Sequence, residues 1–237
     1  MSPNGVKALF FDVFGTLVDW RNGVARDAEL VLQPHGYSID GIAFADAWRE
    51  RYQPAMEEVR SGRIPYTRLD ILHRRTLSQI APRFGLERLD GAVLDRLTLA
   101  WHRLDAWRDV AAGLALLRQR FLIAPVSNGN TMLMCDLARR NELHWDAILG
   151  ADVARDFKPK PAVYLTAADA FGLAPSECLM CAAHSGDLKA AASCGLRTAF
   201  IARPQEHPGV SETAPGVPVD VTADSIEDLA AKLGSSS

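Results

Sequence analysis

The sequence lacks the features that mark membrane, secreted or nucleic-acid-binding proteins. Its apolar runs stay below the ~18 residues that a transmembrane helix needs. The N-terminal MSPNGVK lacks the long apolar segment of a signal peptide. Lysine and arginine form no basic stripe and the net charge is −3, so nucleic acid is not an expected partner. We therefore expect a cytoplasmic protein that engages neither a membrane nor nucleic acid.

Cysteine is also scarce, with four in 237 residues, so the fold is expected to rest on its apolar core. Cys178 and Cys181 have the C-x-x-C spacing of metal and redox sites. However, no second such pair and no nearby pair of histidines completes a zinc site. Their segment has the pattern of a buried strand, on which residues three apart point to opposite faces. We expect all four cysteines to be reduced thiols.

Continuous apolar segments recur along the chain and predict strands buried on both faces, as in a parallel sheet. Helical patterns separate the later segments, which indicates βα units with helices on both faces of the sheet. The sequence therefore predicts an α/β fold. The strand segments are VKALFFDVF (6–14), FLIAPVSN (121–128), AILGAD (147–152), ECLMCAA (177–183) and RTAFIA (197–202).

The stretch from about Trp20 to Trp107 has a different pattern. Four segments with helical periodicity follow one another, and no buried strand lies between them. This predicts an all-helical insertion after the first strand. The expected division is a core domain of residues 1–19 and 106–233, a helical cap domain of residues 20–105, and a disordered tail of residues 234–237.

Four polar residues lie beside predicted strand ends or in the loops that follow. Asp12 and Ser127 end two apolar segments, Lys158 lies in the proline-rich DFKPKPAVY, and Asp187 begins a helical pattern. Each alone has a structural interpretation, such as turn chemistry, a solvated lysine or a helix-terminal acid. Together they predict a site at the carboxyl edge of the sheet, where open α/β sheets bind ligands.

This order of motifs resembles the haloacid dehalogenase superfamily over about residues 6 to 230. The superfamily has a Rossmann-like core, a cap inserted after the first strand, and an aspartate nucleophile on that strand. The resemblance implies that Asp12 is the nucleophile. It also implies that Ser127, Lys158 and Asp187 represent the second, third and fourth motifs.

One position narrows the resemblance. Phosphatases of the superfamily carry a second aspartate two residues after the nucleophile, which helps to hold magnesium and protonates the leaving alcohol. Phe14 stands there in this chain and can do neither. FDVFGTL therefore resembles the type II 2-haloacid dehalogenases, whose halide leaving group needs no proton. This implies an enzyme, a hydrolase of carbon–halide bonds, that converts short 2-haloalkanoic acids to 2-hydroxy acids through an Asp12 ester, without metal or cofactor.

The family resemblance implies further site residues. Thr16 matches a threonine near the nucleophile, and Tyr164 matches an active-site tyrosine. Arg49, which follows Trp48 on a predicted cap helix, matches an arginine that binds substrate and halide. Asn128 matches a halide-site asparagine, and the rings of Phe14 and Trp48 are expected around the halide. By itself, Arg49 would be interpreted as a solvated helix arginine, and only the resemblance favours the binding role.

The fourth motif departs from the family pattern Ser-x-Asn-x-x-Asp. Ala182 replaces the serine and His184 the asparagine, whereas Asp187 is kept. The histidine form resembles a subgroup that includes sequences able to process fluoroacetate. His184 could position water or hydrogen-bond Asp187 or Asp12, and a purely structural histidine is an equal alternative.

Other functions stay open at this stage. The same aspartate chemistry could open a strained ring beside a carboxylate, and a magnesium-dependent phosphatase or a non-catalytic binding protein with a relic site are further alternatives. The resemblance also implies preference for L enantiomers and a homodimer built partly through the cap. The substrate partner is expected to be a small 2-haloacid.

Overall fold

The strands form one parallel sheet. The structure of the chain, a computed structural model, describes residues 5–234. Its six strands follow the order β3-β2-β1-β4-β5-β6, and every neighbouring pair is parallel. The predicted α/β fold is therefore confirmed. The strands are β1 Ala8–Phe11, β2 Leu122–Ser127, β3 Leu149–Gly150, β4 Cys178–Ala182, β5 Arg197–Ile201 and β6 Val221–Ala223.

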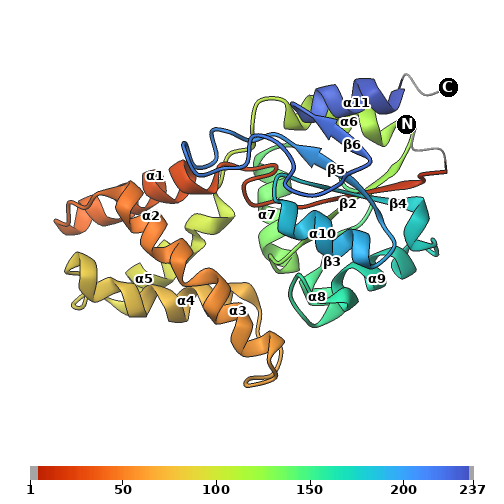
Figure 1. Cartoon of the computed structure of the whole chain (residues 1–237). Coiled ribbons are helices and arrows are strands. Elements are labelled where there is room, and N and C mark those ends of the chain that lie inside the picture. Colours follow the sequence, from red (N-terminus) through yellow and green to blue (C-terminus); the bar gives the residue numbers. More distant parts are fainter. Residues whose placement is uncertain (1–4, 235–237) are drawn as a thin grey trace.

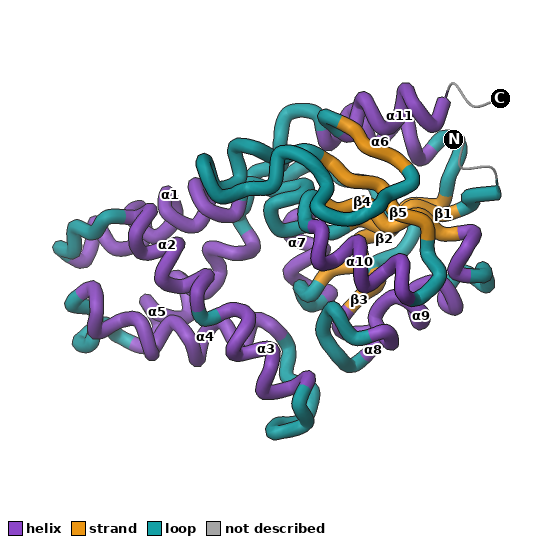
Figure 2. Tube along the Cα trace, viewed as in Figure 1, coloured by secondary structure: helices purple, strands orange, loops and turns teal. Residues whose placement is uncertain are grey.

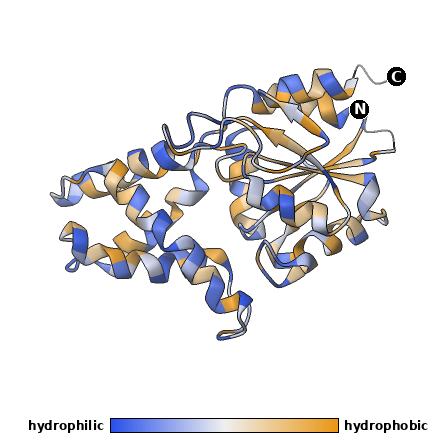
Figure 3. Cartoon of the chain, in the orientation of Figure 1, coloured by the Kyte–Doolittle hydropathy of each residue, from blue (hydrophilic) through white to orange (hydrophobic). Residues whose placement is uncertain are grey.

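Helices cover both faces of this sheet (Figure 1). Alternate residues of β1 point to opposite sides, with Leu9 and Phe11 in one apolar cluster and Ala8 and Phe10 in the other. In Figure 3 the strands are mostly orange and white, while blue residues gather in loops and on helix surfaces. The first cluster includes residues of α6 Val110–Arg118, α7 Thr131–Arg140 and α11 Ile226–Gly234, and the second those of α9 Pro161–Ala170 and α10 Ser185–Ser193.

The cysteines follow the strand geometry. Cys178 belongs to one apolar cluster and Cys181 to the other, on opposite faces of β4. All four cysteines are free thiols. No helix among residues 5–234 combines the length and apolar character needed to cross a membrane.

Between β1 and β2 the chain forms a helical layer beside the sheet (Figures 1 and 2). The two crossings between layer and core lie side by side. Val18 forms a bridge with Ala106, and the Asp19 amide donates to the Asp105 carbonyl over 2.9 Å. The domain limits at 19/20 and 105/106 stay a prediction. The helices of this layer are α1 Trp20–Leu32, α2 Gly41–Glu50, α3 Tyr52–Arg60, α4 Leu69–Ile80 and α5 Gly91–Thr98.

Within the helical layer, residues 44–60 belong to two helices rather than one. α2 ends and α3 begins around Arg51, which caps both. Pro54, in the first turn of α3, explains the break because proline lacks an amide hydrogen and its ring would clash with the carbonyl of residue 50 in a continuous helix. The break determines how Arg49 and Tyr52 lie relative to each other.

Other differences concern short elements. AILGAD forms a strand only over Leu149–Gly150 before α8 Ala151–Ala154 begins. Gly150 has φ +108°, and a Cβ there would lie 2.4 Å from the Ser127 carbonyl oxygen, so the close approach of β3 to β2 requires glycine. Gly234, expected in the tail, ends α11, whereas residues 235–237 lie outside the described residues.

Candidate active site

A cavity of about 410 Å³ lies at the carboxyl ends of the central strands, against helices α2 and α3. Parallel strands bring their C-terminal residues to one edge, so side chains distant in sequence meet there. The cavity therefore combines residues of the core with residues of the helical layer. Its lining comprises Asp12, Phe14, Arg49, Tyr52, Gln53, Asn128, Lys158, Pro159, Tyr164, His184, Gly186 and Asp187.

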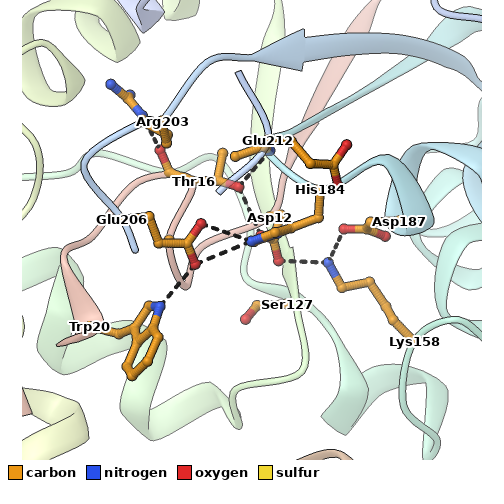
Figure 4. Close-up of polar contacts among 12 residues, drawn as sticks. Asp12, Thr16, Trp20, Ser127, Lys158, His184, Asp187, Arg203, Glu206 and Glu212 are labelled. Atoms are coloured by element: carbon orange, nitrogen blue, oxygen red, sulfur yellow. Dashed lines mark hydrogen bonds and ion pairs between the residues drawn. The ribbon is translucent and has the colours of Figure 1, made fainter. Parts of the chain in front are cut away.

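Asp12 is the buried acid at the centre of this site. Its amide donates to the Cys181 carbonyl over 3.0 Å, which extends the β1–β4 pairing by one residue. Its carboxylate receives three hydrogen bonds: Lys158 Nζ reaches Oδ1 at 2.8 Å, Thr16 Oγ1 reaches Oδ2 at 2.8 Å, and His184 Nδ1 lies 3.2 Å from Oδ2 (Figure 4). Asp12 is 7% exposed, so these donors replace water around it.

The turn after Asp12 places Thr16 under the carboxylate. Gly15 has φ +83°, a conformation that side chains rarely adopt. The Thr16 hydroxyl accepts from the Ala183 amide over 2.9 Å, so its own proton is available to Asp12. The buried Arg203 donates to the Thr16 carbonyl over 2.8 Å. The turn is therefore held by the residue that follows β4 and by the loop after β5.

Lys158 joins two carboxylates. Its ammonium lies 2.8 Å from Asp12 Oδ1 and 2.5 Å from Asp187 Oδ2, and Tyr164 donates to the other oxygen of Asp187 over 2.5 Å. The Lys158 amide donates to Asn128 Oδ1 over 2.7 Å, which ties the loop before α9 to the end of β2. Residues from four predicted segments thus form one hydrogen-bonded network.

The charges in this network set its protonation states. Burial pushes the pKa of Asp12 upward, but the Lys158 charge and the hydrogen bond and charge of His184 outweigh it, so its pKa lies well below its ordinary value. Burial lowers the pKa of Lys158, but the two carboxylates raise it above its usual range. Burial dominates at Asp187 and raises its pKa. Asp12 is therefore an ionised, weakly hydrated carboxylate, as a nucleophile requires.

His184 contacts Asp12 on one side and Glu206 on the other. Its Nε2 lies 3.0 Å and 3.2 Å from the Glu206 oxygens. Burial lowers the pKa of His184, but hydrogen bonds to both carboxylates and their charges raise it to about 10. His184 is thus an imidazolium at neutral pH and donates through both nitrogens. Of the sequence alternatives, the structure brings it to Asp12.

The helical layer contributes one cation and an aromatic wall. The Arg49 guanidinium lies 4.1 Å from the centroid of the Tyr52 ring and 5.0 Å from that of Trp20. Its Nη1 is buried and has no hydrogen-bond partner among residues 5–234. Phe14 meets Tyr52 edge to face at 6.3 Å. Arg49 therefore offers an unused donor beside a partly apolar cavity.

Three predicted residues do not line the cavity: Thr16, which is buried beneath Asp12, Trp48 and Ser127. Trp48 is buried within the helical layer, where its indole donates to the His73 carbonyl and to Thr76. Tyr52 and Phe14 present their rings to the cavity instead. Ser127 is fully buried and accepts from the Gly129 amide over 3.0 Å, so it shapes the turn after β2.

Sequence reasoning missed two residues of the site. Tyr52 lies three positions after Arg49, a helical spacing that could have indicated a shared face. Glu206 lies in the polar segment RPQEHPG, where nothing in the pattern distinguishes it from an exposed loop acid. Only the folding of the loop after β5 over the site buries it.

The residues present do not fit a magnesium ion. Magnesium prefers octahedral oxygen ligands, including one or two carboxylates. Here the Lys158 ammonium donates hydrogen bonds to one oxygen of Asp12 and one of Asp187, and position 14 carries a phenyl ring instead of an oxygen ligand. Among residues 5–234, no group of three or more His, Cys, Asp or Glu is arranged to hold a metal.

Comparisons with known proteins agree with this geometry. A model of haloacid dehalogenase-like hydrolases matches residues 6–195. (S)-2-haloacid dehalogenase 4A of Burkholderia cepacia is 30% identical over 215 residues, or 90% of this chain and 89% of that protein. The structure of a defluorinating L-2-haloacid dehalogenase is 44% identical with a TM-score of 0.95, covering 98% of both chains. Another L-2-haloacid dehalogenase is 45% identical with a TM-score of 0.93, covering 98% of this chain and 100% of that one. This chain therefore belongs to the haloacid dehalogenase-like hydrolase family.

Proposed function

We propose that the protein hydrolyses short 2-haloalkanoic acids to 2-hydroxy acids without a metal ion. The observation that carries this proposal is the pairing of an ionised, buried Asp12 with Phe14 in the same cavity. Such a carboxylate can displace a group that leaves as a stable anion. The phenyl ring of Phe14 has no proton to give to a leaving alkoxide. The 2-haloacid dehalogenases among its relatives support the same substrate class.

Substrate binding uses Arg49, the cation that the helical layer contributes to the cavity. The carboxylate and halogen of a haloacid are held by Arg49, whose Nη1 lacks a partner among the described residues, and by Asn128. Asp12 attacks the halogen-bearing carbon in line, which breaks the carbon–halogen bond, inverts that carbon and forms an ester. The departing halide carries the negative charge away past Arg49 and the rings of Phe14 and Tyr52.

Water then hydrolyses the ester. Asp187 lines the cavity and its raised pKa makes it a stronger base than an ordinary aspartate, so it takes the proton of the attacking water. Lys158 remains between the two carboxyl groups and Tyr164 holds Asp187 in place. Closing the helical layer over the site limits the number of water molecules near the ester.

The cavity volume of about 410 Å³, which Arg49 and Tyr52 line on the side of the helical layer, suits small substrates. We propose haloacetates and 2-halopropionates, in the L form, as the class. Fluoroacetate is included because His184 is a cationic donor beside Asp12 and because one relative is a defluorinating enzyme.

Halide release tests this function. The purified protein is incubated with chloroacetate, fluoroacetate and each enantiomer of 2-chloropropionate, with a chelator present throughout. We expect halide release by the wild type and its loss in Asp12→Asn. A single turnover in ¹⁸O-water should place the label on Asp12. No halide release, together with magnesium-dependent phosphate release from an aryl phosphate, would replace this proposal by the phosphatase alternative.

We also propose a homodimer in the cytoplasm. The dimer rests on family resemblance, and the four free thiols are those expected in a reducing compartment. Sedimentation of the purified protein and fractionation of cells that express it test the two statements separately.

A further inference from the structure

His184 lies in a row of three charged groups, and the reaction steps above use only one of its neighbours. Asp12 Oδ2 lies 3.2 Å from Nδ1, and a Glu206 oxygen lies 3.0 Å from Nε2. Figure 4 shows the imidazole between the two carboxylates, with Glu206 on the side away from Lys158. Glu206 has no part in substrate binding or in the attack, so its burial beside the site needs another explanation.

Several contacts fix the Glu206 carboxylate in place. The Trp20 indole donates to Oε1 over 2.8 Å, and Glu206 is 7% exposed. Its carboxylate lies directly on Gly15, where an added Cβ would come within 2.0 Å of Oε1. Burial raises the pKa of Glu206, but the hydrogen bond and charge of His184 lower it below its ordinary value overall. An ionised carboxylate is therefore fixed behind the imidazole.

We propose that Glu206 is a positioning residue for ester hydrolysis, an inference that rests on the proposed function: it holds the His184 imidazolium on Asp12 Oδ2 after Asp12 has become a neutral ester. Thr16 Oγ1 donates to the same oxygen over 2.8 Å. Among the described residues, Oδ1 meets only Lys158. Oδ1, with one donor, is the attacking oxygen, and Oδ2, with two, becomes the ester carbonyl.

The hydrolytic step then has a defined oxyanion site. Water adds its oxygen to Asp12 Cγ, Asp187 takes one water proton, and the carbonyl electron pair moves to Oδ2. The Thr16 hydroxyl and the His184 N–H donate to this oxyanion. When the pair returns, the Cγ–Oδ1 bond breaks, and Oδ1 leaves as the hydroxyl of the 2-hydroxy acid with the proton from Asp187. Asp12 now carries the oxygen of water and the second water proton, and it is regenerated as a carboxylate when that proton leaves to solvent.

Glu206 matters more for this step than for the first. In the resting enzyme Asp12 and Glu206 both oppose the effect of burial on His184. Once Asp12 is alkylated its charge is gone, and Glu206 is the remaining carboxylate in contact with the ring. Without Glu206 the ring would lack a carboxylate partner in the neutral ester, so the imidazole would lose the charge that favours its proton and the contact that orients it before the oxyanion forms. Ester formation, during which Asp12 is still charged, does not have this requirement.

Glu206→Gln tests the inference because glutamine keeps the size and the acceptor for Trp20. We expect the pre-steady-state burst of halide from chloroacetate to be within about twofold of wild type. The steady-state rate should fall roughly tenfold, less than the 10²–10³-fold typical of losing an oxyanion donor outright. Acid-quenched enzyme should accumulate the carboxymethyl ester, detected by intact-protein mass spectrometry. Glu212→Gln is the matched control, since Glu212 lies on the same loop but bonds Ser185.

The pH profile separates positioning from simple loop damage. The groups in contact with His184 are Asp12 and Glu206, and Arg49 acts on Glu206 through its charge. The imidazolium exists below its pKa, so in Glu206→Gln the steady-state rate should decline at lower alkaline pH than in wild type. His184→Gln, at a partly exposed side chain, should likewise slow hydrolysis and accumulate ester.

Four results would overturn the inference. Three are an equal fall of burst and steady-state rates, a slow variant without accumulated ester, and the same behaviour in Glu212→Gln. The fourth is an unchanged Glu206→Gln. Wild-type protein that releases no halide would instead refute the proposed function itself, so the two failures are distinguishable.

Discussion

Replacing Lys158 by methionine should make stability depend on pH in a way that the wild type does not show. Lys158 is 6% exposed and its ammonium lies between Asp12 and Asp187. Methionine fills a similar volume but leaves two carboxylates buried together. One of them must then take up a proton or remain as an uncompensated charge, and the second outcome costs about 3–5 kcal/mol.

The magnitude follows from the distances. With charge centres about 4 Å apart and an effective dielectric constant of about 20, the ammonium contributes about 4 kcal/mol per carboxylate. This corresponds to about three pKa units. In the wild type the pKa of Asp12 is depressed, so its stabilising contribution is present above the unfolded value and is lost only in strong acid. Without Lys158 the buried pair acquires a raised pKa, so the variant loses stability as pH rises from about 4 through that value.

Thermal unfolding at pH 5 and pH 8 measures this difference. At pH 8 we expect Lys158→Met to melt roughly 8–16 °C below wild type, because 1 kcal/mol corresponds to about 2–4 °C in a protein of this size. At pH 5 the gap should narrow by half or more. Lys160→Met, on the same loop but exposed, is the control and should change little at either pH. A gap that is equal at both pH values would refute the electrostatic reasoning.

Two further substitutions test the turn that carries Asp12. Thr16→Val removes the hydroxyl that bridges Asp12 and the Ala183 amide, so denaturant unfolding should show a loss of about 1–3 kcal/mol and halide release should fall; Thr16→Ser, which keeps the hydroxyl, should retain most of both. Arg203→Lys should cost about 2 kcal/mol by the same measurement, because lysine cannot bond Asp109 twice while reaching the Thr16 carbonyl; a fully stable variant would show that the fork is not needed.

The sequence predicts the parts of the fold that correspond to long, mainly apolar segments. β1, β2, β4 and β5 lie in mainly apolar runs that the sequence reveals, because burial on both faces leaves few polar residues within a strand. β6 was missed because three residues cannot establish a period, and β3 is shorter than AILGAD because Gly150 ends it. Neither is visible until the neighbouring strand is present.

The site shows the same limit. Asp12 could be predicted because it directly follows a buried strand, and parallel strands bring their ends together. Asp187 lies in the first turn of the helix after β4, whereas Lys158, in the loop between α8 and α9, could be predicted only from the order of motifs that resembles the family. The spacing of Tyr52 from Arg49 gives only a partial signal, because each residue turns a helix by about 100° and the break at Arg51 between α2 and α3 resets the phase. Glu206 depends on how the loop after β5 folds, and no periodic pattern describes that path.

The charge balance of the site connects these residues to the direction of the proposed reaction. Before substrate binds, the carboxylates of Asp12, Asp187 and Glu206 face three cations, Lys158, His184 and Arg49. A haloacid adds one negative charge in a poorly hydrated cavity, which is unfavourable unless a charge leaves. Attack by Asp12 transfers its charge to the halide. When the halide departs, the substrate carboxylate takes the place of the Asp12 charge and three anions again face three cations. The same field that tolerates a buried nucleophile therefore favours expulsion of the halide and opposes its return before water completes the reaction.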